Sequence, residues 1–367
     1  MILEANFAAK LRELLGGVTW LRNVQVAQIG GKADEGFDLL ASLPLPNGGR
    51  AMLFVKCKAE FRPSMFPTVA SKVPPSSGRY SASVRVLALP FVSPRMADLC
   101  KASGWSWFDL AGNCLIDVPG VLHLEHTGNP PVHRPPKPSA NLGTPEAGRL
   151  IRALLAPENA GRVWKQRDIQ AHLRDLRFPV SLGLVNKVVR HLRDEAFIED
   201  RPEGGFHLRD PLKLLFAWRE AYRFDRHERR LYFTLLQGKR LHDALARLGL
   251  ETGGFSAYAA FSAAEFQAPH VRQPKVWLYV SASEIHRFEE RIEAKTVDSG
   301  ESLVVLIPHD DGVFYLGDAG KGGPMVCTNP VQTYVDLYHC GGRGQEAAEA
   351  LLEQRLKPEW KGLGLPV

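Results

Sequence analysis

The sequence has few of the features that mark secreted, zinc-binding or membrane-spanning proteins. Its 367 residues include only five cysteines, and no two of them form a C-x-x-C pair that would hold zinc or a redox disulfide. No stretch approaches the ~20 consecutive apolar residues that cross a bilayer. Glu4 and Glu13 interrupt the N-terminal segment, so we expect no signal peptide. These absences predict a cytoplasmic protein that takes no metal or other cofactor and does not bind membranes.

The charge of the chain is ordinary in amount but uneven in its distribution. Hydrophobic residues make up 45% of the chain and charged residues 23%, which is typical of folded domains, and the length suits two or three of them. Residues 1–242 carry 35 Lys and Arg against 23 Asp and Glu, whereas residues 243–367 carry 11 against 17. The net charge of +6 therefore combines +12 with −6. This split predicts one part that faces a polyanion and another part with a different role.

A proline-rich break divides the chain. Residues 127–143, TGNPPVHRPPKPSANLG, contain five prolines and no acidic residue, which is typical of an extended linker. A softer boundary is expected where the basic region gives way to the acidic half. We predict a multidomain α+β protein with five parts: an N-terminal α/β domain (1–126), the linker (127–143), a helical DNA-binding domain (144–210), a basic helical connector (211–242) and a C-terminal α/β domain (243–367).

The N-terminal domain is predicted to open with an amphipathic helix at residues 4–15. Strands are then expected at residues 24–29, 37–43, 51–58, 83–92, 108–118 and 121–126, with a helix at 94–103. Asp38 lies in the second strand, and the third ends in FVKCK, which contains Lys56 and Lys58. This pattern resembles the restriction-endonuclease-like fold, in which an acid on one strand and an acid-x-Lys on the next hold Mg²⁺ and a water molecule.

The resemblance is partial where metal binding would occur. Lys56 stands in the place of the second carboxylate, and a lysine offers a divalent cation like charge and no oxygen ligand. Glu60, expected on the same strand face as Lys58, is the available substitute. We therefore expect a degenerate, structural form of the fold. The alternative is a Mg²⁺-dependent nuclease with Asp38, Lys58 and Glu60 as catalytic residues.

Residues 144–210 predict a winged helix-turn-helix. Thr144 and Pro145 start a first helix, residues 164–173 form a short second helix, and Ser181 caps a third. Strands at 197–199 and 206–208 flank the residues RPEGG and form a hairpin. In such domains the third helix enters the major groove, where Arg and Lys reach phosphates or guanine and Asn reads adenine. The predicted DNA-binding residues of this domain are Lys165, Gln166, Ser181, Asn186, Lys187, Arg190, Arg193 and Arg201.

The following segment adds basic charge. Residues 211–240 contain eight basic and three acidic residues, and among them Arg223 and Arg226 are predicted to extend the DNA contact. The alternative is a solvated helix face. The preceding domain, with 12 basic and 10 acidic residues, is itself only weakly basic. The alternative that it is a protein-interaction module is therefore also open.

The C-terminal domain is predicted to be α/β without an obvious active site. Helices are expected at residues 257–266, 333–338 and 344–353, and strands at 275–280 and 302–307. The run HDDG at residues 309–312 contains metal-ligand residue types, but between two strands it is typical of a turn. There is no Gly-Ser loop with a spaced Asp pair, which argues against a nucleotidyltransferase.

Four segments together are similar to a known family. In chain order they are WFDLAGNCLID, VSLGLVNKVVRHLRDEAFIEDRPEGGFHLRDPLKLLFAWREAY, FSAYAAF and VQTYVDLYHCGGRGQEAAEALL. Their order along residues 85–355 resembles that of the AbiEi-type antitoxins of type IV toxin–antitoxin systems. The better-known members have their winged helix at the N-terminus, whereas this chain has residues 1–143 before it.

The resemblance implies that the protein is a transcriptional autoregulator of a phage-defence operon and that it is not an enzyme. It implies that the winged helix binds promoter repeats in double-stranded DNA and that the C-terminal domain counteracts a separate nucleotidyltransferase-type toxin. A homodimer is expected because promoter repeats mirror protein symmetry. Tyr334, Asp336, Arg343 and Glu346 match the family's terminal motif and are expected to fix a helix junction. The alternatives from other classes are the nuclease and a protein-interaction scaffold.

Overall fold

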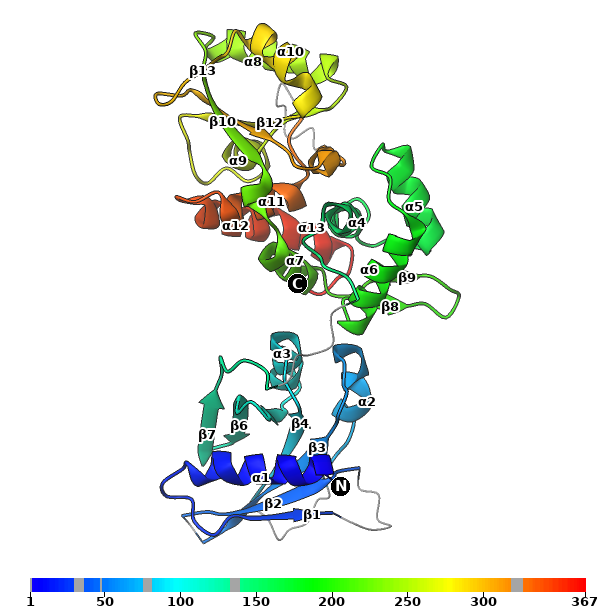
Figure 1. The fold of residues 1–367 in the computed structure, drawn as a ribbon, viewed down its shortest axis with the longest axis vertical. Coiled ribbons are helices and arrows are strands. Elements are labelled where there is room, and N and C mark those ends of the chain that lie inside the picture. Colours follow the sequence, from blue (N-terminus) through cyan, green and yellow to red (C-terminus); the bar gives the residue numbers. More distant parts are fainter. Residues whose placement is uncertain (1, 30–35, 47, 75–80, 133–138, 318–325) are drawn as a thin grey trace. The chain divides into compact units, whose positions relative to one another are not determined.

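The chain folds into two compact units, which are described separately. In the computed structural model drawn in Figure 1 they comprise Met1–Lys137 and Pro138–Val367. The structure describes residues 2–29, 36–46, 48–74, 81–132, 139–317 and 326–367. The predicted linker falls partly on residues 133–138, which lie outside the described residues. Within the described ranges, no helix has both the length and the apolar character needed to cross a membrane.

A seven-stranded sheet forms the centre of the N-terminal unit, and its strands follow one another in chain order. Neighbouring strands are parallel from β3 to β5 and antiparallel elsewhere. The strands are β1 (Gln25–Gln28), β2 (Leu39–Pro44), β3 (Arg50–Cys57), β4 (Ala82–Leu89), β5 (Ser106–Asp109), β6 (Cys114–Val118) and β7 (Leu122–His126). The unit is therefore mixed α/β, as the sequence predicts.

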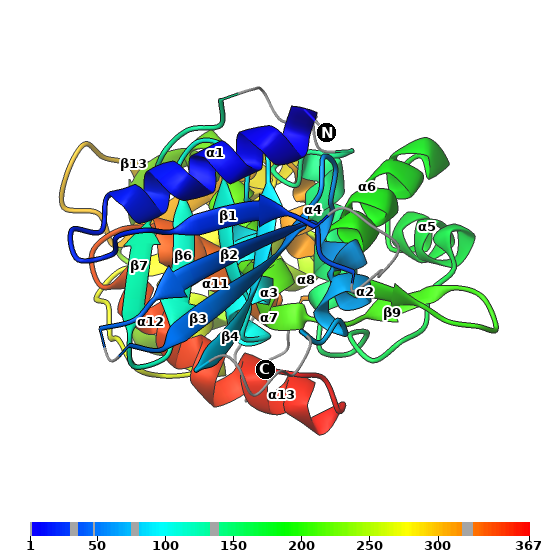
Figure 2. The ribbon, with the colours of Figure 1, turned by 90° about the horizontal axis from the view of Figure 1, so that it is seen from below.

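Helices cover both faces of this sheet. Figure 2 shows α1 (Ile2–Gly16) lying across one face, and the opposite face packs against α2 (Phe66–Ala70) and α3 (Pro94–Ala102). Side chains alternate along a strand, so Val55 of β3 points toward α1 while Phe54 points toward α2 and α3. A central strand buried on both faces is apolar throughout, which is what the sequence of β3 provides.

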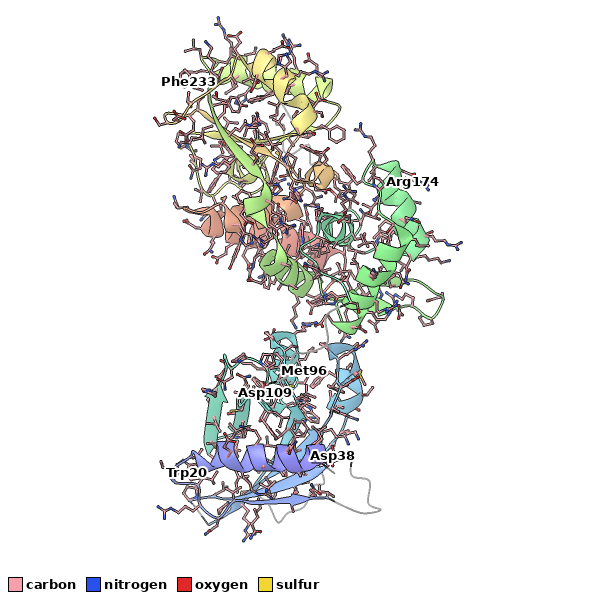
Figure 3. The ribbon with its side chains drawn as sticks, viewed as in Figure 1. Trp20, Asp38, Met96, Asp109, Arg174 and Phe233 are labelled. Atoms are coloured by element: carbon pink, nitrogen blue, oxygen red, sulfur yellow. The ribbon has the colours of Figure 1, made fainter. Side chains whose placement is uncertain are left out.

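The single strand predicted at residues 108–118 is wrong, because two strands and a turn occupy this segment. Asp109, labelled in Figure 3, ends β5 and is fully buried. Its carboxylate accepts hydrogen bonds from Asn113 N (2.9 Å), Asn113 Nδ2 (2.9 Å) and Val92 N (3.2 Å). Gly112 adopts a φ of 92°, which favours glycine. The DLAGN run thus forms a turn in which Asn113 hydrogen-bonds to the carboxylate of Asp109.

Three helices and a hairpin open the C-terminal unit, in the places where the sequence predicts them. Thr144 caps the first helix by accepting a hydrogen bond from Ala147 N (3.4 Å), and Ser181 caps the third by accepting one from Leu184 N (3.2 Å). Trp164 pairs with the last strand of the hairpin through a bridge to Phe206. The elements are α4 (Pro145–Leu155), α5 (Gln166–Asp175), α6 (Leu182–Asp194), β8 (Ile198–Asp200) and β9 (Phe206–Leu208).

A second sheet, of five strands, follows in the order β11-β12-β14-β10-β13. Leu303 and Val305 of β14 pack into the core beside α8 and α10, whereas Val304 and Leu306 belong to the core that contains α11 and most of α9 (Figure 1). The strands are β10 (Glu228–Phe233), β11 (Ser256–Tyr258), β12 (Val276–Val280), β13 (Lys295–Thr296) and β14 (Leu303–Ile307). The helices are α7 (Pro211–Ala221), α8 (Gly238–Glu251), α9 (Ala260–Gln267), α10 (Ile285–Ile292), α11 (Pro330–His339), α12 (Gly344–Leu351) and α13 (Lys357–Gly362).

Two stretches predicted as helical contain strands. In the basic connector (211–242), the segment Glu228–Phe233 is strand β10, which lies between β14 and β13. In this strand Tyr232 is fully buried against Phe288, while Arg229 is exposed. In the helix predicted at 257–266, the first residues form β11, and α9 begins at Ala260.

A buried carboxylate links α4 to the second sheet. Asp336 of α11 is fully buried, and its Oδ1 accepts hydrogen bonds from Gln332 Nε2 (2.7 Å), Tyr222 OH (2.8 Å) and Tyr279 OH (3.0 Å). Gln332 Oε1 in turn accepts a hydrogen bond from Nε of Arg152 in α4 (2.6 Å). Burial raises the pKa of Asp336 to about 7, although its hydrogen bonds favour the charged form.

His227 completes this network as a neutral imidazole. Its Nδ1 accepts a hydrogen bond from the backbone N–H of His309 (3.2 Å), so the proton is on Nε2, which donates to Tyr222 OH (2.7 Å). The Tyr222 proton is then free to go to Asp336. Burial, and after it the charge of Arg152, lowers the pKa of His227 to about 4. A protonated ring would have no acceptor at Nδ1, which agrees with this direction.

Replacing Asp336 by Asn is expected to change the pH dependence of stability. Burial raises the pKa of Asp336 above its ordinary value of 3.8, so the folded state holds this proton more tightly and loses stability as the pH rises through 7. Between pH 5 and pH 8 the free energy of unfolding of the wild type should fall by about 2 to 3 kcal/mol. Asp336→Asn has no proton to release at this position, so its stability should not fall in this way. Thermal unfolding at both pH values measures the difference. A Tm offset between variant and wild type that stays constant with pH would contradict the assignment.

Candidate nucleic-acid interface

The outer face of α6 presents three of the predicted DNA-binding side chains together. Asn186, Lys187 and Arg190 are exposed, and none of them makes a hydrogen bond or ion pair within the described part of the chain. The opposite face is apolar and fully buried through Val185, Val188, Val189 and Leu192. Packing therefore fixes the rotation of the helix and leaves the three polar side chains available for a ligand.

Four further predicted residues lie at the ends of elements around α6. Lys165 is the exposed N-cap residue of α5, and Gln166 is its half-buried first residue. The hydroxyl of Ser181 is engaged as the cap of α6. Arg201 is exposed in the turn that joins β8 to β9. That turn requires Gly205, because its φ is 87° and a Cβ there would lie 2.8 Å from Trp164 O.

Two predicted residues are engaged in internal ion pairs. Arg193 binds Asp200 of β8 through two hydrogen bonds of 2.8 Å, which join the end of α6 to the hairpin. Arg223 binds Asp225 through hydrogen bonds of 2.9 and 2.6 Å. Their role in DNA binding stays a prediction, and each would have to give up its pair to contact a phosphate.

Arg223 and Arg226 line a different part of the unit from the α6 face. Together with the start of α4 and the loop after β14 they border a small cavity, to which α6 contributes no lining residue among those described. The structure thus separates the predicted site residues into an α6 group and a cavity group. Charge counting along the sequence could not distinguish them.

An exposed cation that the prediction did not include lies next to Lys165 and Gln166. Arg167, in the first turn of α5, is exposed and makes no ion pair with any described residue. The signal is present in the run KQR at residues 165–167, of which the predicted set includes only the first two residues. It belongs with Lys165 as a candidate for phosphate contact at the start of that helix.

Asp38, the first of the nuclease-like residues, is paired with Lys56 and not with Lys58 or Glu60 among the described contacts. Asp38 Oδ1 lies 3.0 Å from Lys56 Nζ, and its Oδ2 accepts a hydrogen bond from Cys57 N (2.6 Å). The expectation that Lys58 and Glu60 share a strand face is wrong, because β3 ends at Cys57 and the exposed Glu60 lies beyond it. Asp38 is therefore held by an internal cation and a backbone donor.

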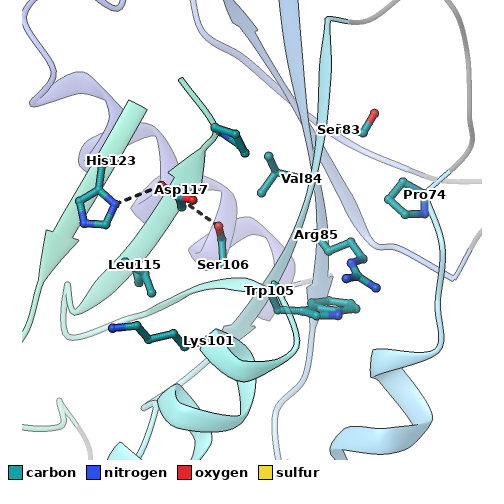
Figure 4. A pocket seen from close by; sticks show the side chains of 12 residues that line it. Pro74, Ser83, Val84, Arg85, Lys101, Trp105, Ser106, Leu115, Asp117 and His123 are labelled. Atoms are coloured by element: carbon teal, nitrogen blue, oxygen red, sulfur yellow. Dashed lines mark hydrogen bonds and ion pairs between the residues drawn. The ribbon is translucent and has the colours of Figure 1, made fainter. Parts of the chain in front are cut away.

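The N-terminal unit also has an open pocket of about 650 Å³, shown in Figure 4. It is bordered by Arg85 and Trp105, whereas Lys56 pairs with Leu87 further along β4, so the pocket does not contain the nuclease-like residues. Arg85 is engaged, because it donates hydrogen bonds to Ala70 O (3.2 Å) and Ser103 O (3.0 Å) and stacks over Trp105. The pocket therefore adds nothing to the nuclease hypothesis.

The HDDG run serves as a connection and not as a cluster of metal ligands. Asp310 caps a short 3-10 helix, η4 (Asp311–Phe314), and pairs with Arg149 of α4, whose Nε lies 3.1 Å from both carboxylate oxygens. Burial opposes the ionisation of Asp310, but the hydrogen bonds and charge of Arg149, the charge of Arg152 and the N–H of Gly312 together lower its pKa. Across the described residues, no three His, Cys, Asp or Glu side chains are grouped to hold a metal ion.

Residues 207–357 match the model of a family described as transcriptional regulator, AbiEi antitoxin, type IV TA system. The matched range begins in β9 and ends at the first residue of α13, so α4, α5 and α6 lie outside it. No curated protein and no solved structure matches the chain significantly. The resemblance predicted from the sequence is confirmed over this range: residues 207–357 are similar to the AbiEi antitoxins of type IV toxin–antitoxin systems.

Proposed function

We propose that the chain is a DNA-binding transcriptional regulator that represses its own promoter and acts as the antitoxin of a type IV toxin–antitoxin system. One observation carries the proposal: a single compact unit combines the AbiEi-like range with a helix whose outer face holds free Asn, Lys and Arg side chains. The match supports the regulator and antitoxin class, and the α6 face supports contact with DNA.

The arrangement of α4, α5, α6 and the hairpin supports a winged helix-turn-helix. The 13 residues of α6 extend over about 20 Å, a length that fits the major groove. Asn186 and Arg190 lie one turn apart on the same face, where Asn suits adenine and Arg suits guanine. Lys187 is placed beside them for a phosphate. The β8–β9 hairpin, with Arg201 in its turn, would be the wing.

The N-terminal unit is proposed to be a degenerate form of the restriction-endonuclease-like fold without catalytic activity. The support is the ion pair between Asp38 and Lys56, since the ammonium group takes the carboxylate that would otherwise bind Mg²⁺. For the C-terminal part, the proposed partner is a separate nucleotidyltransferase-type toxin. A homodimer on repeated promoter sites completes the proposal.

Replacing Lys187 and Arg190 by Ala should weaken binding to the chain's own promoter region. Removing a side chain that reads a base is expected to cost about 1 to 3 kcal/mol, and removing one that binds a phosphate should reduce the salt slope by about 1. A gel-shift titration at several salt concentrations measures both effects. The wild type should give its strongest band at ~50 mM salt, where phosphate contacts bind most tightly.

Arg247→Ala is the matched control, because Arg247 is an exposed arginine of α8, outside the three-helix segment. This variant should bind the promoter like the wild type. Equal affinity of all three proteins would show that α6 is not the DNA-binding helix. No retarded band with the wild type would favour the protein-interaction scaffold.

Replacing Asp38 by Asn should lower the stability of the protein. Neither the wild type nor the variant should cleave DNA. Lys56 would lose its partner while largely buried, at a cost of about 1 to 3 kcal/mol, which thermal unfolding detects. Supercoiled DNA incubated with Mg²⁺ or Mn²⁺ should remain intact with both proteins. Cleavage by the wild type that Asp38→Asn abolishes would establish the nuclease in place of the structural role.

A further inference from the structure

A small cavity lies where the three-helix segment meets the second sheet. Its walls come from the first turns of α4, the end of α7, the 3-10 turn η2 (Phe224–Arg226) and the loop after β14. Its volume is about 40 Å³. Since one water needs roughly 10 to 15 Å³ of such space, the cavity has room for about three waters or for one oxyanion of phosphate size.

Arg152 brings a buried positive charge with an unpaired donor atom, Nη1, to this cavity. Its side chain is only 3% exposed, its Nε is held by Gln332, and its guanidinium stacks over Trp218 at 5.1 Å. Neither terminal nitrogen has a hydrogen-bond partner among the described residues. Buried charged donors normally have a partner, because leaving one unpaired is costly. The arginine is thus fixed in position with its terminal donors unpaired.

Two glycines lie directly against Nη1 of this guanidinium, and at Gly312 an added Cβ would also lie 2.5 Å from Asp310 Oδ1. A Cβ on Gly148 of α4 would lie 3.1 Å from Arg152 Nη1, and a Cβ on Gly312 would lie 3.2 Å from the same atom. Any larger residue at either position would crowd the nitrogen.

The other residues that line the cavity do not cancel the positive charge of Arg152. Arg226 is exposed at its rim and makes no ion pair with a described residue, whereas Arg223 is neutralised by Asp225. Asp310 also lines the cavity, but its charge is matched by Arg149. His227 is neutral there. The N-terminus of α4, capped by Thr144, adds partial positive charge at the same place.

We propose that this cavity binds a phosphate-sized oxyanion, either a free anion or the phosphate group of a small nucleotide, with Arg152 and Arg226 as its charged ligands. The bound anion would tie α4 to the loop after β14 and so stabilise the position of the three-helix segment on the sheet. The inference that the anion changes promoter binding rests on the proposed function. The inference that the anion binds in the cavity does not.

Thermal unfolding of the full chain tests the binding itself. At constant ionic strength, 20 mM phosphate or sulfate in place of chloride should raise the Tm of the wild type by about 2 to 5 °C for a dissociation constant near 2 mM. A larger shift with AMP than with inorganic phosphate would identify a nucleotide, and an equal shift would identify the free anion. No difference from chloride would overturn the proposal, since the cavity would then hold only water.

Two variants locate the effect. Arg226→Gln removes a rim charge, and Gly148→Ala fills the space beside Arg152 without changing any charge in a helix that tolerates Ala. Both should lose most of the shift, and the control Arg247→Gln, on α8, should keep it. A shift that survives in both variants would place the anion elsewhere and overturn the proposal.

A gel shift with and without phosphate then separates the two proposals. If the promoter is bound and phosphate changes its affinity in the wild type but not in Gly148→Ala, the coupling holds. Promoter binding that responds equally in both proteins would overturn the coupling. A phosphate-dependent Tm without any promoter binding would refute the proposed function and leave the anion site in place.

Discussion

The C-terminal unit depends on a carboxylate that is buried without a cation in direct contact. Asp336 draws hydrogen bonds from two tyrosines and a glutamine, and Arg152 reaches it only through that glutamine. Its neighbours come from α7, β12, α11 and α4, so a single polar centre sets how these elements meet. The neutral His227 completes this centre through its hydrogen bond to Tyr222 OH. The position of α6 follows from this centre, since α6 packs on the helix that carries Arg152.

The charge split of the sequence has a different structural meaning from the one that counting by segment suggests. Much of the basic excess at residues 211–242 is used within the unit, through pairs such as Arg223 with Asp225 and Arg230 with Glu228. Arg219 reaches the hydroxyl of Tyr334, a residue of the terminal motif. Exposed cations without an ion pair to a described residue include those on α6, at the start of α5, at the rim of the cavity and on α8. The local number of free charges, and not the regional sum, marks a surface for a polyanion.

Sequence patterns predict what local spacing controls. The helical period around Val185, Val188 and Val189 is sufficient to place Asn186 and Arg190 on the outer face, and residue type alone identifies the N-caps Thr144 and Ser181. The strand at 228–233 gives no such signal, because its charged residues continue a run begun in α7. Partners distant in sequence, such as Arg152 with Gln332 or Arg149 with Asp310, leave no local signal at all. The candidate site was therefore predictable on α6 and not around the cavity.

The range that matches the AbiEi family begins inside a hairpin whose other half lies before it. β9 pairs with β8 and with Trp164. Just beyond the other end of the matched range, Trp360 donates a hydrogen bond to Leu155 O of α4 (3.0 Å). The segments on either side of residue 207 therefore share one core and cannot be exchanged as independent modules. A different three-helix segment could be acquired only together with compatible residues at Gln332 and Trp360. In this unit, the three-helix segment and the part that is similar to the AbiEi antitoxins must therefore change together in evolution.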